Sequence, residues 1–356
     1  MDFFPFILSL FLVLHLSGQS VTQVEARHHH HHHHHKHHRH HISKLFVFGD
    51  SYVDTGNIKR GLANSWKEPY GITFPGKPAG RFSDGRVFTD YIAKYLKLKS
   101  PVPYSVRELM PKHLKYGMNY AFGGTGVFQT LFSGPNMTTQ IDFFEQQIKD
   151  KLYSTKDIRN SVALVSVAGN DYTFYNVKNG SVQGFPSFVA SLINQTVINL
   201  IRIKELGVKK VIMSGLQPIG CLPQQTAGTS FKQCNETSNT ILASHNNLLR
   251  QAINKLNQQT NDTSSPFLFL NLHDTFMSVL NHPTTFNIKD KLKPCCVGVS
   301  NEYFCGSVDE KNVKKYLVCE EPKSAFFWDS VHPTEAGWHA VYNKLRITNA
   351  LEPIYY

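Results

Sequence analysis

Three side chains in this sequence, Ser51, Asp329 and His332, are of the types that can act as a nucleophile, a group that orients a base, and a base. Ser51 ends the tripeptide Gly49-Asp50-Ser51 directly after a short apolar run, and Asp329 precedes His332 by three residues. A serine becomes a strong nucleophile when a histidine takes its proton and a carboxylate orients that histidine. We therefore expect Ser51 to act as the nucleophile, His332 as its base and Asp329 as the residue that orients the base.

The same chemistry needs hydrogen-bond donors for the negative oxygen that develops on the substrate. We expect these donors to be the backbone amides of Ser51 and Gly124 and the side-chain amide of Asn170. The short turn around each of these residues is ordinary by itself, because glycine, aspartate, asparagine and serine are common in turns. The Asp329-x-x-His332 pair also suits a metal, but no third ligand with convincing spacing lies near it. We therefore predict no metal site and no cofactor.

Short apolar runs alternate with helical patterns along the body of the chain. The runs, which predict buried strands, span residues 45–48, 116–121, 162–167, 208–213 and 266–270. Helical spacing of apolar residues recurs at 141–152 behind the capping signature Thr139-x-x-Asp142, and again at 189–200, 241–256 and 338–345. This alternation predicts the α/β class, with one three-layer α/β/α domain around a parallel sheet of about five strands. Ligands bind beyond the carboxyl ends of such strands, so the motifs that follow the strands should meet at one edge.

Four segments carry the chemistry described above, and they span residues 46–57, 119–126, 169–172 and 327–336. Together they resemble the plant-type GDSL esterases and lipases of the SGNH hydrolase superfamily, and the likeness extends over nearly the whole body. The resemblance implies a flavodoxin-like fold, ester substrates, a triad of Ser51, Asp329 and His332, and an oxyanion hole completed by Gly124 and Asn170. Tyr52 stands where the name of the motif has leucine, and we expect it to affect packing more than chemistry. No Gly-x-Ser-x-Gly motif surrounds Ser51, which argues against the α/β-hydrolase fold.

The first 26 residues predict a secretory signal peptide. Residues 3–15 are almost continuously apolar, and Val24-Glu25-Ala26 resembles a cleavage site. A membrane anchor is the alternative, but the apolar stretch is shorter than the ~20 residues that span a bilayer, and no later segment approaches that length. We therefore expect a secreted protein of the cell wall or apoplast, without integral membrane association.

Glycosylation sequons and cysteines agree with export. Sequons begin at five asparagines, which are Asn136, Asn179, Asn194, Asn235 and Asn261, and Asn194 falls within a predicted helix. Six cysteines, an even number, suit disulfides in an oxidising compartment. We expect Cys221 to pair with Cys234 in a local loop, and the adjacent Cys295 and Cys296 each to pair elsewhere.

Histidine is concentrated in one tract. Twelve of the 19 histidines lie in residues 27–41, where Lys36 and Arg39 interrupt the run and make an expression tag the weaker explanation. A disordered, solvated arm is our first interpretation. Weak binding of divalent metals or acidic wall polymers is the second, and a dedicated metal site is the last. Without residues 1–41 the body still carries a net charge of +10, which we interpret as a solvated basic face. A nucleic-acid partner does not fit an exported protein.

The sequence thus predicts a signal peptide at 1–26, a histidine-rich arm at 27–41 and one hydrolase domain at 42–356. The expected activity is hydrolysis of small-molecule, lipid or polysaccharide esters through an acyl-enzyme, with a loss of activity at low pH as His332 becomes protonated. A polysaccharide deacetylase or an acyltransferase would use the same triad, because the motifs do not specify the acyl group or its acceptor. An alternative of another class is a non-catalytic wall- or metal-binding protein that acts through the arm.

Overall fold

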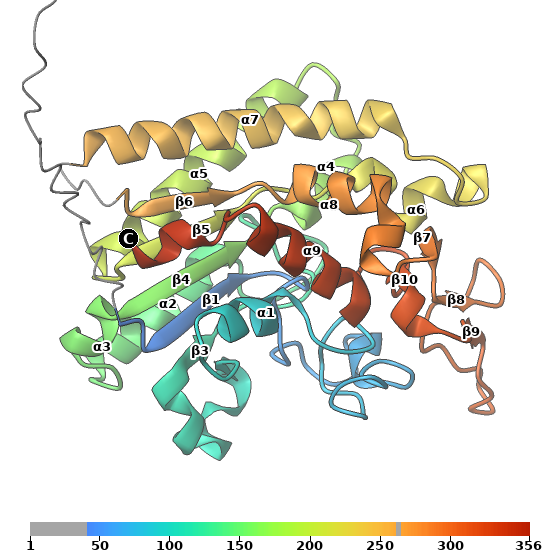
Figure 1. Ribbon diagram of the computed structural model, residues 1–356, viewed down its shortest axis with the longest axis horizontal. Helices are drawn as coiled ribbons and strands as arrows, with labels where there is room; N and C mark the ends of the chain where they lie inside the picture. The colour runs from blue at the N-terminus through green and yellow to red at the C-terminus, as the bar shows by residue number, and fades with distance from the viewer. Residues whose placement is uncertain (1–40, 261–264) are drawn as a thin grey trace, which may run out of the picture. The chain divides into compact units, whose positions relative to one another are not determined.

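A parallel sheet of six strands forms the centre of the fold (Figure 1). The computed structural model describes residues 41–260 and 265–356. The predicted leader, all of the histidine-rich arm except His41, and the sequon at Asn261 therefore lie outside the described residues. Across the sheet the strand order is β2-β3-β1-β4-β5-β6, and every neighbouring pair is parallel. The strands are β1 (Lys44–Gly49), β2 (Val102–Pro103), β3 (Gly117–Asn119), β4 (Ser161–Ser166), β5 (Lys210–Ser214) and β6 (Phe267–Leu270).

Helices cover both faces of this sheet, as the alternation of apolar runs predicts. One layer contains α1 (Phe88–Tyr95), α8 (Leu272–Asn281) and α9 (Glu335–Ile347), and it packs on Leu45 and Val47 of β1. The other contains α2 (Met137–Lys149), α5 (Phe185–Glu205) and α7 (Glu236–Gln259), and it packs on Phe46 and Phe48. In Figure 1, α1 and α9 lie in front of the sheet and α2 and α5 behind it. Successive residues of a strand point to opposite faces, so one buried strand contributes to two separate cores.

Two local details differ from the sequence prediction. The sheet has a sixth strand, β2, whose two residues pair with β3 at the edge and are too few to produce an apolar run. Helix α2 begins at Met137, with Asn136 as its N-cap, so the capping signature at Thr139 was the wrong start. The Asn136 side chain accepts a hydrogen bond from the Thr139 amide at 3.0 Å, as an N-cap asparagine does.

The C-terminal part of the body adds small strand pairs that disulfides hold together. Strands β7 (Asp290–Pro294) and β10 (Ala325–Phe327) pair in parallel, while β8 (Cys296–Gly298) and β9 (Tyr316–Val318) pair antiparallel. The disulfides join Cys221 to Cys234, Cys295 to Cys319 and Cys296 to Cys305. This confirms the predicted local loop and the separate pairing of the two adjacent cysteines. The last two bonds fix an irregular segment that borders the cleft described below.

The remaining helices are short, and one of them carries a predicted site residue. They are α3 (Thr155–Arg159), α4 (Gly169–Val177) and α6 (Pro223–Thr226). Helix α4 follows β4 and has Asn170 in its first turn. Within residues 41–260 and 265–356, no helix is long and apolar enough to cross a membrane.

Candidate active site

The structure brings Ser51, His332 and Asp329 into one hydrogen-bonded chain, although 281 residues separate the first two. Ser51 Oγ lies 2.8 Å from His332 Nε2. On the other side of the imidazole, Nδ1 lies 2.9 Å from each carboxylate oxygen of Asp329. Ser51 follows β1, and the other two residues lie between β10 and α9. One ring nitrogen can thus receive the serine proton while the carboxylate holds the other nitrogen in place.

Asp329 is held by several donors besides the imidazole. Its Oδ1 accepts hydrogen bonds from the Val331 and His332 amides, both at 2.8 Å, and its Oδ2 accepts one from the Tyr70 hydroxyl at 2.7 Å. Burial alone raises the pKa of Asp329, but the imidazole and the N–H donors outweigh it and hold this pKa below its usual value. Burial also raises the pKa of Tyr70 well above its usual value, so this hydroxyl stays protonated and donates.

A close approach of two strands sets the position of the Ser51 turn. Gly49 has φ +144°, and a Cβ on it would lie 1.9 Å from the Ser166 carbonyl oxygen on β4. Only glycine fits this contact. Gln140 of α2 then binds both backbone groups of Gly49, since its Oε1 accepts from the amide at 2.7 Å and its Nε2 donates to the carbonyl at 2.9 Å. The turn that carries Ser51 therefore starts from a fixed peptide.

The predicted oxyanion donors line the same cleft as Ser51 and His332. The Gly124 carbonyl accepts a hydrogen bond from Thr130 Oγ1 at 2.7 Å, and Asn170 Nδ2 donates to the Thr125 carbonyl at 2.9 Å. These bonds fix the peptide planes of the loop at residues 123–126, here called the glycine-rich loop, against the start of α4. Asn170 keeps its second amide hydrogen for another acceptor, because an NH₂ group has two donors.

Asp54 ties the nucleophile loop to the glycine-rich loop. Its carboxylate is fully buried, and it accepts four backbone hydrogen bonds. Oδ1 accepts from the amides of Gly56 at 2.7 Å and Asn57 at 2.6 Å, while Oδ2 accepts from those of Ile58 at 3.1 Å and Gly123 at 2.9 Å. Because Gly123 precedes the predicted oxyanion residue, Asp54 couples the positions of two parts of the site. Asp54 therefore braces the turn that carries the nucleophile.

Two aromatic side chains pack on His332. The Phe82 ring lies with its centroid 4.9 Å from that of the imidazole, and the Tyr52 ring approaches it edge-on at 5.8 Å. Tyr52 also donates a hydrogen bond from its hydroxyl to the Val331 carbonyl at 2.9 Å. The tyrosine next to the nucleophile therefore packs in the core and also fixes the loop that carries His332.

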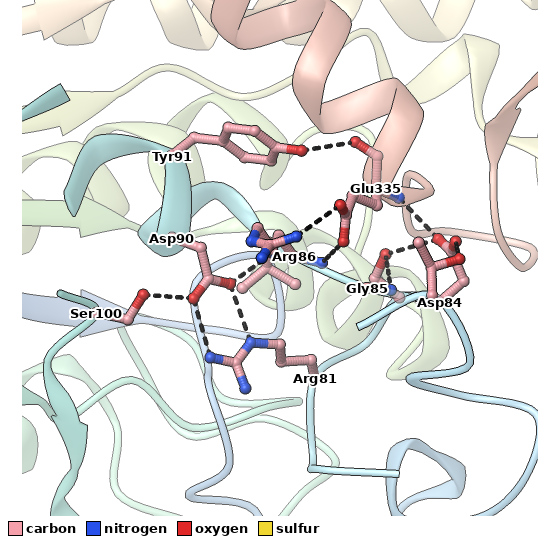
Figure 2. A network of polar contacts seen from close by, with 11 residues as sticks. Arg81, Asp84, Gly85, Arg86, Asp90, Tyr91, Ser100 and Glu335 are labelled. Atoms are coloured by element: carbon pink, nitrogen blue, oxygen red, sulfur yellow. Dashed lines mark hydrogen bonds and ion pairs between the residues drawn. The ribbon is translucent and has the colours of Figure 1, made fainter. Parts of the chain in front are cut away.

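A network of ion pairs fixes the start of α9, three residues beyond His332 (Figure 2). Arg81 donates from Nε and one terminal nitrogen to the Asp90 carboxylate, both at 2.9 Å, and this pair is nearly excluded from solvent. Glu335 accepts from the Arg86 amide at 2.8 Å and from its guanidinium at 2.9 Å. Charge-assisted bonds with two contact points fix orientation as well as distance. The segment that includes Phe82 is thereby tied to the helix that follows the histidine.

Ser51, His332 and Asp329 all line a cleft with a volume of about 790 Å³. Its walls come from the loop after β1, the glycine-rich loop, the segment around α6 and the disulfide-held segment after β7. Several apolar side chains line it, including Leu62, Phe132 and Phe304, which are 53%, 46% and 64% exposed. Of the described residues that line the cleft, only Asp329 and His332 carry a side chain that can be charged near neutral pH.

Comparison with known proteins shows the family of the chain. The family model of the GDSL-like lipases and acylhydrolases matches residues 45–345. The chain belongs to the GDSL-like lipase/acylhydrolase family. It is 52% identical to GDSL esterase/lipase At5g03610 of Arabidopsis thaliana, over 96% of this chain and 95% of the relative. It is 50% identical to GDSL esterase/lipase At3g09930 of the same plant, over 85% of this chain and 87% of the relative. The sequence-based prediction of a GDSL-type carboxylic ester hydrolase is thus confirmed.

A more distant likeness exists among solved structures. An acetylxylan esterase from Geobacillus stearothermophilus aligns with a TM-score of 0.40 and 15% identity, over 85% of this chain and 93% of that chain. A likeness of this size carries no argument about the substrate of the GDSL protein.

One buried histidine lies outside the cleft. His245 on α7 is buried, its Nδ1 lies 2.9 Å from the Tyr172 hydroxyl, and burial lowers its pKa to about 4. It is a neutral core histidine, as its place in an apolar stripe predicts. Among the described residues, no group of three or more histidine, cysteine or acidic side chains could hold a metal ion.

Sequence reasoning missed Tyr70 and Gln140. Nothing in the local pattern distinguishes Tyr70 from the other tyrosines, because its contact with Asp329 spans 259 residues and depends on the folded loop. Gln140 did carry a weak signal, since it is a polar residue beside Ile141 on the apolar face of α2. A buried polar side chain on such a face normally has a specific partner.

Tyr70→Phe should lower kcat for ester hydrolysis by about tenfold and leave KM nearly unchanged. The variant removes one hydrogen bond to a carboxylate, and such bonds contribute about 1.5–3 kcal/mol. Asp329 keeps its backbone donors, so the loss should stay well below that of removing a triad member. Steady-state kinetics on a 4-nitrophenyl ester measure the effect. Tyr303→Phe, at a tyrosine that lines the same cleft without contacting Asp329, is the control; equal kcat values for the two variants would contradict the assignment.

Proposed function

We propose that this chain is a secreted serine hydrolase that cleaves carboxylic esters through an acyl-enzyme on Ser51. The observation that carries the proposal is the continuous chain of contacts from Ser51 Oγ through His332 to Asp329, at 2.8 and 2.9 Å, at the floor of the cleft. Asp329 orients the imidazole, and the Ser51 amide, the Gly124 amide and the Asn170 side chain bind the oxyanion.

The reaction proceeds in two stages. His332 Nε2 takes the hydroxyl proton as Ser51 Oγ attacks the carbonyl carbon, and the oxyanion donors stabilise the negative oxygen. The intermediate collapses, the bond to the alcohol breaks, and His332 returns the proton to the leaving oxygen. Water then attacks the acyl-enzyme with His332 again as base, which releases the acid and restores Ser51. Activity falls at low pH because a protonated His332 cannot accept the serine proton.

The lining of the cleft favours neutral esters with a bulky apolar or hydroxyl-rich part. Side chains such as Leu62 and Phe304 offer apolar contact, while Asn64 and Asn301 offer hydrogen bonds. Small-molecule, lipid and acetylated polysaccharide esters all meet this description. An acyltransferase would use the same residues with an alcohol in place of water.

The proposal includes passage through a secretory compartment. Three disulfides stabilise the described body, which fits an oxidising environment. Asn179 and Asn194 are exposed and accessible to glycosylation. Asn235 is also exposed, but its side chain caps α7, and Asn136 is half-buried and caps α2. We assign residues 1–26 to a signal peptide and 27–41 to a histidine-rich, solvated arm outside the hydrolase domain at 42–356. Weak binding of acidic polymers or divalent metals by this arm is the second interpretation.

The test is hydrolysis of 4-nitrophenyl esters by the purified protein, with and without EDTA and with a serine-directed organophosphate. We expect turnover that EDTA leaves unchanged and the organophosphate abolishes. A folded protein that hydrolyses no ester in the panel, or one that the organophosphate does not inactivate, would overturn the proposal. A variant without residues 27–41 should keep full turnover, and loss of turnover would contradict an arm outside the hydrolase domain.

A further inference from the structure

A second, smaller cavity adjoins Ser51, and His332 is not among the residues that line it. Its volume is about 170 Å³, against about 790 Å³ for the main cleft. Ser51, Asn170, Gln224 and Val331 line both cavities, whereas His332 and Gly124 line only the main cleft. The small cavity lies beyond the carboxyl ends of β4 and β5, and its lining includes Gly169, Thr173, Leu216, Gln217 and Ile219.

The four groups on the reacting carbon decide what each cavity holds. One is Ser51 Oγ, and one is the oxyanion, which needs the Gly124 and Asn170 donors. The third is the leaving oxygen, which must lie within reach of His332 Nε2 to receive its proton. The fourth group is the acyl chain, which needs neither His332 nor Gly124. The small cavity is lined by neither of these residues, so the acyl chain is the group that it can hold.

We propose that the small cavity is the acyl-binding pocket and that it restricts this hydrolase to short acyl groups on bulky alcohols. This inference rests on the proposed function. A water-sized group occupies about 30 Å³ in a liquid, so about 170 Å³ holds five or six carbon-sized groups. Acyl chains from acetyl to about hexanoyl fit, while the main cleft accommodates a much larger alcohol.

A carboxyl group in the small cavity also discriminates between acyl groups by their charge. Asp50 lines it, and burial raises the pKa of Asp50 to about 7. Above neutral pH this side chain becomes a carboxylate that repels an anionic acyl group such as succinyl. We therefore expect uncharged acyl groups to react faster.

Gly169 offers a direct way to change the pocket. It lines the small cavity but not the main cleft, and a Cβ on it would meet no atom within 4 Å. Its φ is not in the left-handed range, so a side chain fits without backbone strain. A valine there adds three carbon-sized groups, about half of the cavity volume by the same measure.

The experiment compares wild type, Gly169→Val and Gly228→Val on 4-nitrophenyl esters with acyl chains of two to twelve carbons. Gly228 is the matched control, because its Cβ position is also open and it lines neither cavity. For wild type we expect kcat/KM to fall at least tenfold between hexanoyl and dodecanoyl. In Gly169→Val the hexanoyl-to-acetyl ratio of kcat/KM should fall at least tenfold, while Gly228→Val keeps the wild-type ratio.

The dependence of kcat/KM on acyl-chain length in wild type tests the chain-length limit by itself, whether or not Gly169→Val folds. Ile219→Ala, which enlarges the pocket from another side, should raise the octanoyl-to-acetyl ratio severalfold. A wild type that prefers dodecanoyl esters, or an unchanged ratio in folded Gly169→Val, would overturn the acyl pocket and leave the serine hydrolase intact. A folded wild type that hydrolyses no ester overturns the proposed function instead.

Discussion

His332→Ala is expected to lower kcat for ester hydrolysis by about 10⁴- to 10⁶-fold, the range seen when serine hydrolases lose the catalytic base. The imidazole is the group that contacts Ser51 Oγ, at 2.8 Å, and it is itself bonded to Asp329. Without it, no other side chain in the described part of the chain hydrogen-bonds to Ser51 Oγ, so none is placed to take its proton or return one to the leaving alcohol. Steady-state kinetics on a chromogenic ester, with thermal unfolding measured in parallel, test this expectation.

A matched histidine gives the control. His282 is exposed and lies outside the cleft, so His282→Ala should keep wild-type kcat. The two variants remove the same side chain and differ only in its place. A loss below about tenfold in a folded His332→Ala protein would be incompatible with His332 as the base.

Asp54→Ala is expected to lower the free energy of unfolding by about 4 kcal/mol. The substitution leaves four buried backbone amides without an acceptor, and each unsatisfied buried group costs about 1–3 kcal/mol, with partial relief from relaxation and water. Because the Gly123 amide is among them, the glycine-rich loop should also lose its position. Urea unfolding of the oxidised protein measures the loss of stability.

Asp290→Ala provides the comparison for Asp54→Ala. Asp290 is an exposed aspartate at the start of β7, so its removal should change stability by less than about 0.5 kcal/mol. An Asp54→Ala protein with an unfolding free energy within about 1 kcal/mol of wild type would contradict the bracing role of this carboxylate.

The arrangement of the site followed from the sequence because parallel topology does most of the positioning. Ser51, Gly124 and Asn170 each follow a strand of one sheet within five residues, and carboxyl ends of parallel strands share one edge. Local order along the chain therefore predicted long-range proximity. Asp329 and His332 follow β10, which pairs with β7 outside the central sheet, so the motif and the family resemblance predicted their place rather than the sheet topology.

The remaining features depend on contacts that no local pattern records. Tyr70 reaches Asp329 across 259 residues, and Cys295 could have paired with either Cys305 or Cys319. Strand β2 owes its existence to pairing with β3 rather than to its own two residues. The acyl pocket is likewise a volume between elements, and Gly169 gives no sign of it in the sequence.

The role of Ser51 as nucleophile is the central claim, and mapping a covalent adduct tests it most directly. Wild type and Ser51→Ala would be treated with a serine-directed organophosphate and measured by intact mass and peptide mapping, with esterase turnover followed in the same samples. We expect a single adduct on Ser51 in the inactivated wild type, and neither adduct nor turnover in folded Ser51→Ala. An adduct on another residue, or wild-type turnover in Ser51→Ala, would contradict the account.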